Sequence, residues 1–281
     1  MKIINTVKEM KRYAKHNNRR GRKIALVPTM GYFHNGHLML IREARKRCDR
    51  LVVSIFVNPL QFGRGEDFAT YPRNVKRDLT LARECKVNVI FAPSSEELYP
   101  PRYSTFIEED LLSKKLCGPF RPGHFKGVTT VVGKLLNIVR PHTVVFGQKD
   151  AQQAAIIKKM ITDLNYPVRI AVMPTVREKS GLACSSRNRY LSSRERKEAA
   201  VIYRSLLRAK EEVGSGMKDV RRIIGVVKEV LSDAPLVRLE YLAAVNPDTL
   251  EHTRTVNEKT LIAIAARVGK ARLIDNIIVE P

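Results

Sequence analysis

The stretch 24–44 constrains the fold of this chain more than any other part of the sequence. It begins with the continuous apolar run 24–27, which predicts a short buried strand, and it ends in residues 38–44, whose apolar side chains recur at helical spacing. The ten residues PTMGYFHNGH at 28–37 lie in between, contain two glycines and predict a tight turn. A strand, a glycine turn and a helix in this order indicate one unit of a parallel α/β sheet.

The glycine turn predicts an anion site. Gly31 and Gly36 leave room for a ligand to approach the backbone, and the following helix points its unpaired N–H groups and positive dipole end at the turn. His34 and His37 are three residues apart, so both imidazoles project from one face toward the anion if Gly36 lies in the first helical turn. The pair could instead hold a metal or be structural, but no Cys, Asp or Glu lies within five residues to complete a zinc site. We expect both histidines to donate hydrogen bonds to phosphate oxygens.

Strands and helices alternate through the first two thirds of the chain. We predict strands at 24–27, 51–57, 87–91, 143–146 and 168–173, and helices at 6–17, 36–48, 78–85 and 127–139. This alternation predicts an α/β fold with a right-handed parallel sheet, a Rossmann-like nucleotide-binding domain. The short segment 104–109 is predicted to pair at a sheet edge.

The composition changes after Pro174. The segment 176–190, VREKSGLACSSRNRY, is polar. It is followed by predicted helices over 193–213 and 218–231 and by predicted strands at 237–245, 261–267 and 272–279. The sequence therefore predicts a Rossmann-like catalytic domain, residues 1–175, followed by a smaller α+β domain, residues 176–281.

Amide side chains follow one of the predicted strands at the edge where open parallel sheets bind their ligands. Asn58 and Gln61 come directly after the strand 51–57, and their amides suit hydroxyl or carboxylate groups. Gln153 lies one helical turn after Asp150 and is expected to face the same cleft as Gln61.

Two further segments offer groups for phosphate. Gly147-Gln148-Lys149-Asp150 follows the strand 143–146, and Lys149 is a point charge suited to a phosphate, although a surface lysine at a helix start is the alternative. Ser185-Ser186-Arg187 presents two hydroxyls and a guanidinium fork, although such a tripeptide is also common in solvated turns.

The chain is strongly basic, with a net charge of +23 and an isoelectric point near 10.1. The excess runs through the whole sequence, aromatic residues make up only 6%, and no basic-aromatic stretch resembles an RNA-stacking platform. We therefore expect attraction of anionic substrates rather than nucleic-acid binding. No apolar run reaches the ~20 residues of a membrane span. Without a signal peptide at its start and with four scattered cysteines, the chain is expected to be soluble, cytoplasmic and not bound to a membrane.

Several motifs together resemble one family. The HxGH pattern resembles the nucleotidyltransferase superfamily of adenylate-forming enzymes and class I tRNA synthetases. The full set resembles the pantothenate synthetases, also called pantoate-beta-alanine ligases, in order and spacing. These motifs are PTMGYFHNGH (28–37), SIFVNPLQF (54–62), EDFATYPR (66–73), RPGHFKGVTTVV (121–132), FGQKDAQQ (146–153), VREKSGLACSSRNRYLS (176–192) and, in the last third, ARLIDN (271–276).

The resemblance implies an ATP-dependent ligase of two steps. Pantoate would attack the α-phosphate of Mg-ATP to give pantoyl adenylate and pyrophosphate, and beta-alanine would then displace AMP to form pantothenate. The family also implies Mg²⁺ as cofactor, a homodimer, and a C-terminal domain that closes over the ATP site. The resemblance points to Asp78 or Asp150 as a residue that helps to position Mg²⁺ and does not identify the metal ligands.

The resemblance also implies roles for single residues. His37 matches the proton donor, and His34 and Lys149 join it as catalytic candidates. Gln61 and Gln153 match the glutamines that hold pantoate, and Gln61 also borders beta-alanine. The positions that match ATP-binding residues are Met30, Gly31, Tyr32, Phe33, His34, Asn35, Gly36, His37, Gly147, Gln148, Lys149, Asp150, Val176, Cys184, Ser185, Ser186 and Arg187.

The sequence departs from the family at a few places. Cys184 replaces the usual Met, Lys179-Ser180 replaces a pair ending in Asp, and Cys117 stands where Glu is frequent. Two rival functions remain open at this point: another HxGH adenylyltransferase that needs no amine, and an RNA-binding module related to tRNA synthetases.

Overall fold

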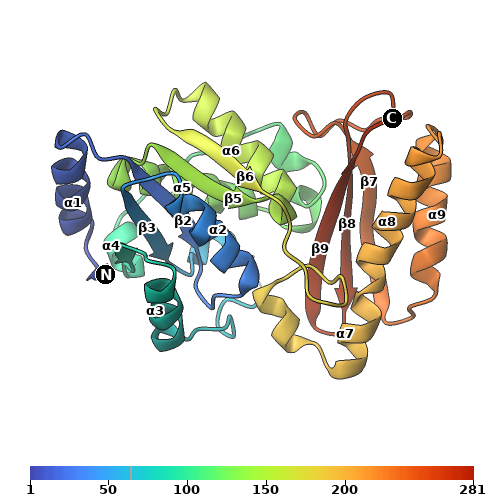
Figure 1. The fold of residues 1–281 in the computed structure, drawn as a ribbon, viewed down its shortest axis with the longest axis horizontal. Helices are drawn as coiled ribbons and strands as arrows, with labels where there is room; N and C mark the ends of the chain where they lie inside the picture. The colour runs from blue at the N-terminus through green and yellow to red at the C-terminus, as the bar shows by residue number, and fades with distance from the viewer. Residues whose placement is uncertain (64) are drawn as a thin grey trace. The chain divides into compact units, whose positions relative to one another are not determined.

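The computed structural model describes residues 1–63 and 65–281 and contains two compact units (Figure 1). The N-terminal unit consists of Met1–Ser113, Gly118–Gly147 and Ile156–Met173. The C-terminal unit consists of Lys114–Cys117, Gln148–Ala155 and Pro174–Pro281. The sequence-based division into functional domains at 175/176 stays a prediction.

The N-terminal unit is built on a six-stranded parallel sheet, as the alternation of apolar runs predicts. Its strands follow the order β1-β4-β3-β2-β5-β6. They are β1 (Lys2–Ile4), β2 (Ile24–Thr29), β3 (Arg50–Ile55), β4 (Val89–Phe91), β5 (Thr143–Gly147) and β6 (Arg169–Met173). β2 pairs in parallel with β3 on one side and with β5 on the other. The predicted Rossmann-like fold is confirmed.

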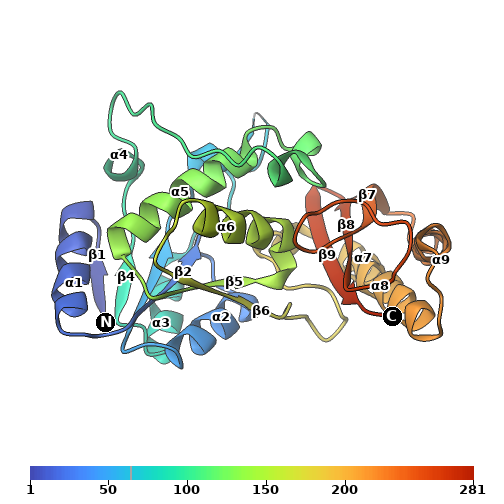
Figure 2. The same cartoon turned by 90° about the horizontal axis from the view of Figure 1, so that it is seen from above.

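Helices cover both faces of this sheet (Figure 2). α2 (Asn35–Arg45) and α3 (Val75–Glu84) pack on one face, where their apolar stripes meet alternate residues of β2 and β3. α5 (His124–Val139) lies on the other face, and α1 (Val7–Arg19) packs against it. α4 (Ser95–Leu98) is a single turn, and α6 (Ala151–Asp163) begins in the C-terminal unit and ends in this one.

Two parts of the N-terminal unit differ from the sequence-based prediction. β1 was not predicted, because three residues are too few to show a period of two, and it pairs with β4 at the sheet edge. The segment 104–109 forms no strand. Ile107 instead receives a hydrogen bond from the Thr129 hydroxyl and donates its N–H to the Thr130 hydroxyl, so side chains of α5 satisfy its backbone.

The C-terminal unit contains a three-stranded antiparallel sheet, β7-β8-β9, with helices on one face. The strands are β7 (Val237–Val245), β8 (Thr260–Val268) and β9 (Ala271–Val279). α8 (Val201–Gly214) and α9 (Val220–Ser232) pack on that face of the sheet around a common apolar core. The single helix predicted over 193–213 is divided at Ala200 into α7 (Ser193–Ala199) and α8.

The described residues contain no helix with the length and apolar character needed to cross a membrane.

Candidate active site

The order in which the chain adds strands to the N-terminal sheet reverses at β2. The chain proceeds from β2 to β3 on one side, and β5 lies on the other side of β2. In an open parallel sheet, ligands bind in the crevice outside the carboxyl ends of the strands at such a point. β2 ends at Thr29 and β5 ends at Gly147, so the turn after Thr29 borders this crevice.

The turn after β2 is held by hydrogen bonds to its own backbone. The Thr29 hydroxyl donates to the Ser54 carbonyl at 2.6 Å and accepts from the Gly31 N–H at 3.1 Å. Gly31 has φ +82°, and a Cβ there would lie 2.9 Å from Ile55 Cγ2 and 3.1 Å from Asp78 Oδ2. The turn therefore needs glycine at 31 for both its backbone angle and its space.

Asp78 fixes the next two residues of the turn. Its two carboxylate oxygens accept from the Tyr32 and Phe33 N–H groups, each at 2.7 Å. Tyr32 has φ +53°, an uncommon value for a residue with a side chain. Burial raises the pKa of Asp78, against the opposing pull of these two N–H groups and of Arg77. Because each oxygen accepts a backbone N–H, the structure gives Asp78 a role in shaping the turn. A part in positioning Mg²⁺ stays a prediction.

His34 and His37 begin α2 as a reciprocal cap. His34 is the N-cap residue, and its Nδ1 accepts from the Gly36 N–H at 3.1 Å. His37 Nδ1 accepts from the His34 N–H at 3.4 Å, and the two ring centroids are 4.0 Å apart. A neutral imidazole that accepts through Nδ1 carries its proton on Nε2. Both histidines therefore have a donor at Nε2, beside the N-terminus of α2.

Phe33 lies under this cap. Its side chain is fully buried, and its ring centroid is 5.7 Å from that of His37. Its carbonyl accepts from Arg77 Nη1 at 2.8 Å. The Phe33 N–H also donates to Asp78, so both backbone groups of Phe33 help to shape the turn. The ATP-binding role that the resemblance implies for Phe33 stays a prediction.

Asn58 and Gln61 lie together after β3, in and beside the 3-10 helix Pro59–Gln61. Asn58 is fully buried, and its Nδ2 donates to Gln61 Oε1 and to the Gly127 carbonyl, both at 3.0 Å. Asn58 Oδ1 accepts from the Tyr99 hydroxyl at 2.9 Å. Because Asn58 binds the Gln61 amide oxygen, a ligand at Gln61 would meet the NH₂ group, which is a donor.

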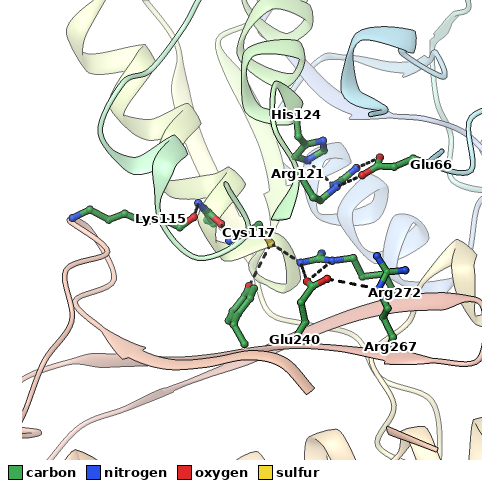
Figure 3. Close-up of polar contacts among 10 residues, drawn as sticks. Glu66, Lys115, Cys117, Arg121, His124, Glu240, Arg267 and Arg272 are labelled. Carbon is green, nitrogen blue, oxygen red and sulfur yellow. Dashed lines mark hydrogen bonds and ion pairs between the residues drawn. The ribbon is translucent and has the colours of Figure 1, made fainter. Parts of the chain in front are cut away.

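Arg121 and His124, at the N-terminal end of α5, support the Gln61 backbone; Figure 3 shows these two side chains beside Glu66. His124 Nδ1 donates to the Gln61 carbonyl at 2.8 Å, and Arg121 Nη2 donates to the same carbonyl at 3.2 Å. Arg121 also pairs with both carboxylate oxygens of Glu66, at 2.8 and 2.6 Å. Gly127 makes this approach possible, because a Cβ there would lie 2.8 Å from the Gln61 nitrogen and closer still to the Leu60 carbonyl.

The C-terminal unit holds the second group of candidate residues. Gln148–Asp150 form a 3-10 turn, where Lys149 Nζ lies 3.7 Å from Asp150 Oδ1. Gln153 is half-buried in the first turn of α6. The neighbouring Gln152 is buried and structural, because it accepts from the Cys117 N–H at 2.9 Å and donates to the Lys115 carbonyl at 2.6 Å.

Residues 176–184 form a narrow hairpin in the same unit. The Cys184 N–H donates to the Val176 carbonyl at 2.9 Å, and Arg177 pairs with Ala183 as an antiparallel bridge. Ser185 caps the 3-10 helix Ser186–Tyr190 by accepting from the Arg187 N–H at 3.3 Å.

The departures from the family are accommodated locally. The Ser180 hydroxyl accepts from the Leu182 N–H at 3.4 Å, so the hairpin turn keeps a side-chain acceptor. Cys117 Sγ accepts from Arg272 Nη2 at 3.3 Å, and Arg272 pairs with Glu240 at 2.5 Å (Figure 3). Cys184 is buried, and its N–H is paired within the hairpin.

The described residues contain no cluster of three or more His, Cys, Asp or Glu side chains that could hold a metal ion.

Sequence reasoning missed the contacts that Asp78 and His124 make in this arrangement. The resemblance points to Asp78 only as a residue beside Mg²⁺, and His124 lies in the motif at 121–132, but their partners are 46 and 63 positions away. No local signal in the sequence connects residues so far apart.

The parallel sheet and the capped HxGH turn beside its crevice define a class, the Rossmann-like α/β proteins. A family model described as Pantoate-beta-alanine ligase matches residues 2–278. The chain belongs to the pantoate-beta-alanine ligase family and is a ligase.

Individual relatives agree along the whole chain. A pantothenate synthetase of Heliobacterium modesticaldum is 52% identical over 280 residues, which cover 100% of both chains. The crystal structure of pantothenate synthetase from Thermus thermophilus is 43% identical, with a TM-score of 0.95 and full coverage of both chains. A pantoate-beta-alanine ligase from Francisella tularensis, solved in complex with Beta-gamma ATP and Beta-alanine, is 35% identical, with a TM-score of 0.83 and coverage of 99% and 97%.

Proposed function

We propose that this ligase condenses (R)-pantoate with beta-alanine at the expense of ATP, through pantoyl adenylate, with release of AMP and pyrophosphate. The observation that carries the proposal is the start of α2. There, two histidine Nε2 donors and the backbone N–H groups of the first helical turn lie at one helix N-terminus beside the crevice of a parallel sheet. A triphosphate is the ligand that such a site favours. The Francisella relative solved with Beta-gamma ATP supports the same choice.

In the first step, a pantoate carboxylate oxygen attacks the α-phosphorus, and the bond from this phosphorus to the bridging oxygen breaks as pyrophosphate leaves. No general base is needed, because the carboxylate is already ionised. The barrier lies in bringing one anion to another, so catalysis needs positive charge and donors around the phosphates. We assign this role to His34, His37 and the α2 N-terminus in the N-terminal unit and to Lys149 and Arg187 in the C-terminal unit.

In the second step, the beta-alanine amine attacks the acyl carbon, and the bond to the phosphate oxygen breaks as AMP leaves. The amine nitrogen loses a proton to solvent as the amide forms, and AMP leaves as an anion. We assign His37 as the proton donor of the first step, in which its Nε2 proton passes to the leaving pyrophosphate oxygen and is later regained from solvent.

The acid pocket is assigned to Gln61 and Gln153, with Gln61 also bordering beta-alanine. Asn58 supports this assignment, because it binds the Gln61 amide oxygen, so that the end of the amide that meets a carboxylate or hydroxyl is the NH₂ donor.

The residues proposed to bind ATP lie in the turn and helix start at 30–37, in the segment 147–150, and in and directly after the hairpin 176–184. They are Met30, Gly31, Tyr32, Phe33, His34, Asn35, Gly36, His37, Gly147, Gln148, Lys149, Asp150, Val176, Cys184, Ser185, Ser186 and Arg187.

Mg²⁺ is proposed to arrive with the nucleotide. The described residues offer no three-ligand cluster, and Mg²⁺ commonly binds through substrate phosphates with one or two carboxylates. Asp150 is the carboxylate beside Lys149 that could join it. Bound Mg²⁺ would neutralise phosphate charge, and no step above depends on its position.

A homodimer, closure of residues 176–281 over ATP and a cytoplasmic location are parts of the same proposal. The family resemblance supports the first two. The four cysteines, all within the described residues, are free thiols, which supports a reducing compartment.

The histidine assignment can be tested by replacing His37. His37→Ala is expected to lower the rate of pantoyl adenylate formation by about 100-fold or more, because it removes a preorganised donor from the charge that develops. The measurement is single-turnover pyrophosphate release with pantoate and ATP. His37→Gln is the matched control, since glutamine at this helical position can still accept from the His34 N–H but has no imidazole. It should keep the fold and stay slow, and near-normal turnover of His37→Gln would remove the imidazole from the mechanism.

A further inference from the structure

Two adjacent residues of β9, Asp275 and Asn276, bond to two different segments of the candidate ATP site within the C-terminal unit. Neighbouring side chains on a strand point to opposite faces of the sheet. Asp275 bonds to Arg177, whose guanidinium lies over the Tyr203 ring of α8, on the face that the helices cover. Asn276 bonds to the turn 148–150 on the other face. The motif ARLIDN thus ends in two polar residues whose contacts the sequence did not explain.

Asn276 binds the turn through both N–H donors and the oxygen of its side-chain amide. Its Nδ2 donates to the Gln148 carbonyl at 2.9 Å and to the Lys149 carbonyl at 3.0 Å. Its Oδ1 accepts from Gln148 Nε2 at 3.2 Å. The side chain is 5% exposed, so these bonds are made out of contact with bulk water. Two consecutive carbonyls held by one buried NH₂ group fix the peptide planes on both sides of the Lys149 Cα.

Asp275 fixes the hairpin 176–184 in a similar way. Its Oδ2 and Oδ1 bind Arg177 Nη1 and Nη2 at 2.5 and 2.9 Å, a bidentate pair in which the Asp275 side chain is 3% exposed. Arg177 also donates to the Gly181 carbonyl at 3.2 Å. The guanidinium carbon lies 3.4 Å from the Tyr203 ring centroid. The residue before Arg177 is Val176, which the proposed function places at ATP.

We propose that Asn276 is a positioning residue for Lys149, and that the Asp275-Asn276 pair holds the two nucleotide-binding segments of the C-terminal unit in a fixed relation to one strand. Asn276 does not touch substrate in this role. It sets the direction of the Lys149 side chain through the backbone of the turn, while Asp275 sets the hairpin through Arg177. The inference rests on the proposed function, in which Lys149 contacts a phosphate of ATP.

A residue that acts through Lys149 should lose its effect when Lys149 is absent. Asn276→Ala is expected to lower kcat/KM for ATP in adenylate formation by about 10- to 100-fold, because small misplacements of a catalytic group are costly. In the Lys149→Ala background, the same substitution should add less than about a twofold loss, since coupled residues are not additive. KM for beta-alanine should stay unchanged in Asn276→Ala.

Asn276→Asp supplies a second variant that keeps the shape of the side chain. Its carboxylate would face two carbonyl oxygens instead of donating to them, so it should be at least as impaired as Asn276→Ala. Should Asn276→Ala unfold below the assay temperature, Asn276→Ser can replace it in the double-mutant cycle, because a hydroxyl still donates to one carbonyl.

Asn246→Ala is the matched control in the same unit. Asn246 also binds backbone groups, by accepting from the Asp248 and Thr249 N–H groups, but it lies in the loop after β7 and has no assigned contact with substrate. It should leave kcat/KM for ATP unchanged.

These measurements distinguish the proposed role of Lys149 from the positioning role of Asn276. Loss of activity in Lys149→Ala tests the proposed role of Lys149 and says nothing about Asn276. If Asn276→Ala costs the same factor with and without Lys149, the positioning role is wrong. A fall in thermal stability of Asn276→Ala without any change in kcat/KM for ATP would overturn it as well.

Discussion

At the scale of single residues, a buried carboxylate and two backbone N–H groups decide the shape of the HxGH turn. Asp78 is 1% exposed and accepts from Tyr32 and Phe33 at 2.7 Å each. Without it, a turn with a left-handed Tyr32 would bury two N–H groups that have no acceptor. The shape of this turn sets where α2 begins and therefore where the Nε2 donors of His34 and His37 lie.

We predict that Asp78→Asn destabilises the protein by about 1–3 kcal/mol, because the amide can accept only one of the two N–H groups and turns its own NH₂ toward the other. It should also lower the rate of adenylate formation. The measurements are urea unfolding and single-turnover pyrophosphate release. Asp219→Asn is the matched control, since Asp219 also accepts two backbone N–H groups at the start of a helix but is exposed. Unchanged stability and rate in Asp78→Asn would contradict the role of Asp78.

Sequence reasoning predicted the residues of the turn better than the residues that hold it. Glycines, histidines and a following helix are local signals, so the anion site could be inferred from ten letters. The acceptor of the Tyr32 N–H lies 46 positions away, and the donors to the Gln61 carbonyl lie 60 and 63 positions away. Asn276 lies 128 positions from Gln148. Local pattern contains no information about such pairs, so these side chains could be placed only by the fold.

At the scale of elements, α5 and the turn after β3 form one rigid corner. Gly127 lets the helix approach the turn closely. The Gly127 carbonyl accepts from Asn58 Nδ2, and His124 Nδ1 donates to the Gln61 carbonyl. α5 begins at His124, three residues before the predicted start at 127.

Gly127→Ala is predicted to move the turn away from α5, because the added methyl would lie 2.8 Å from the Gln61 nitrogen and closer to the Leu60 carbonyl. Overpacking of this kind costs about 1–3 kcal/mol. We expect a raised KM for pantoate with a smaller change in KM for ATP, measured by pyrophosphate release. Gly225→Ala in α9 is the matched control, because nothing lies within 4 Å of a Cβ there. An unaltered KM for pantoate would show that the turn does not form the acid pocket.

The ion pair between Glu66 and Arg121 gives this corner a pH dependence. Partial burial pushes the pKa of Glu66 up, but the hydrogen bonds and charge of Arg121, with His124, outweigh it and hold the pKa below its ordinary value. A carboxyl whose pKa is lowered by folding adds stability that is complete above its unfolded pKa, about 4.3. This stability is lost as pH falls through the lower pKa of the folded state.

Glu66→Gln should therefore reduce the free energy of unfolding at pH 7 by up to about 1 kcal/mol and have a smaller effect below pH ~4. The measurement is urea unfolding of both proteins across this range. Glu108→Gln is the control, since Glu108 pairs with Lys126 at 3.0 Å but both side chains are exposed, and it should change little at any pH. An effect of Glu66→Gln that is the same at pH 3 and pH 7 would contradict the account.

The errors at this scale have physical causes. The segment 104–109 has polar and apolar residues in an order that allows a strand. In the structure, however, hydroxyls of α5 form hydrogen bonds with the Ile107 N–H and carbonyl, so these groups do not pair with a neighbouring strand. The division of the helix at Ala200 has no glycine or proline to announce it. Long apolar strands such as β3 were predicted well, because burial on both faces leaves a continuous run.

At the scale of the whole molecule, the candidate residues are divided between two units. The HxGH turn and Gln61 belong to the N-terminal unit, whereas Lys149, Gln153 and Arg187 belong to the C-terminal unit. The order of βαβ units predicted the parallel sheet of the first unit. The division into functional domains at 175/176 stays a prediction. The membership of Lys114–Cys117 and Gln148–Ala155 in the C-terminal unit follows from long-range pairing and left no mark on composition.

The measurement that tests the central claim most directly is the balance of products. Purified protein is incubated with ATP, Mg²⁺ and pantoate, with and without beta-alanine, and AMP, pyrophosphate and pantothenate are quantified. The account predicts sustained AMP release only when both acid and amine are present, with one pantothenate for each AMP. In single turnover without amine, it predicts pyrophosphate release that depends on pantoate. A rate of AMP release that is the same with and without beta-alanine would contradict a ligase that works through pantoyl adenylate. Formation of pantothenate without an equal amount of AMP would contradict it as well.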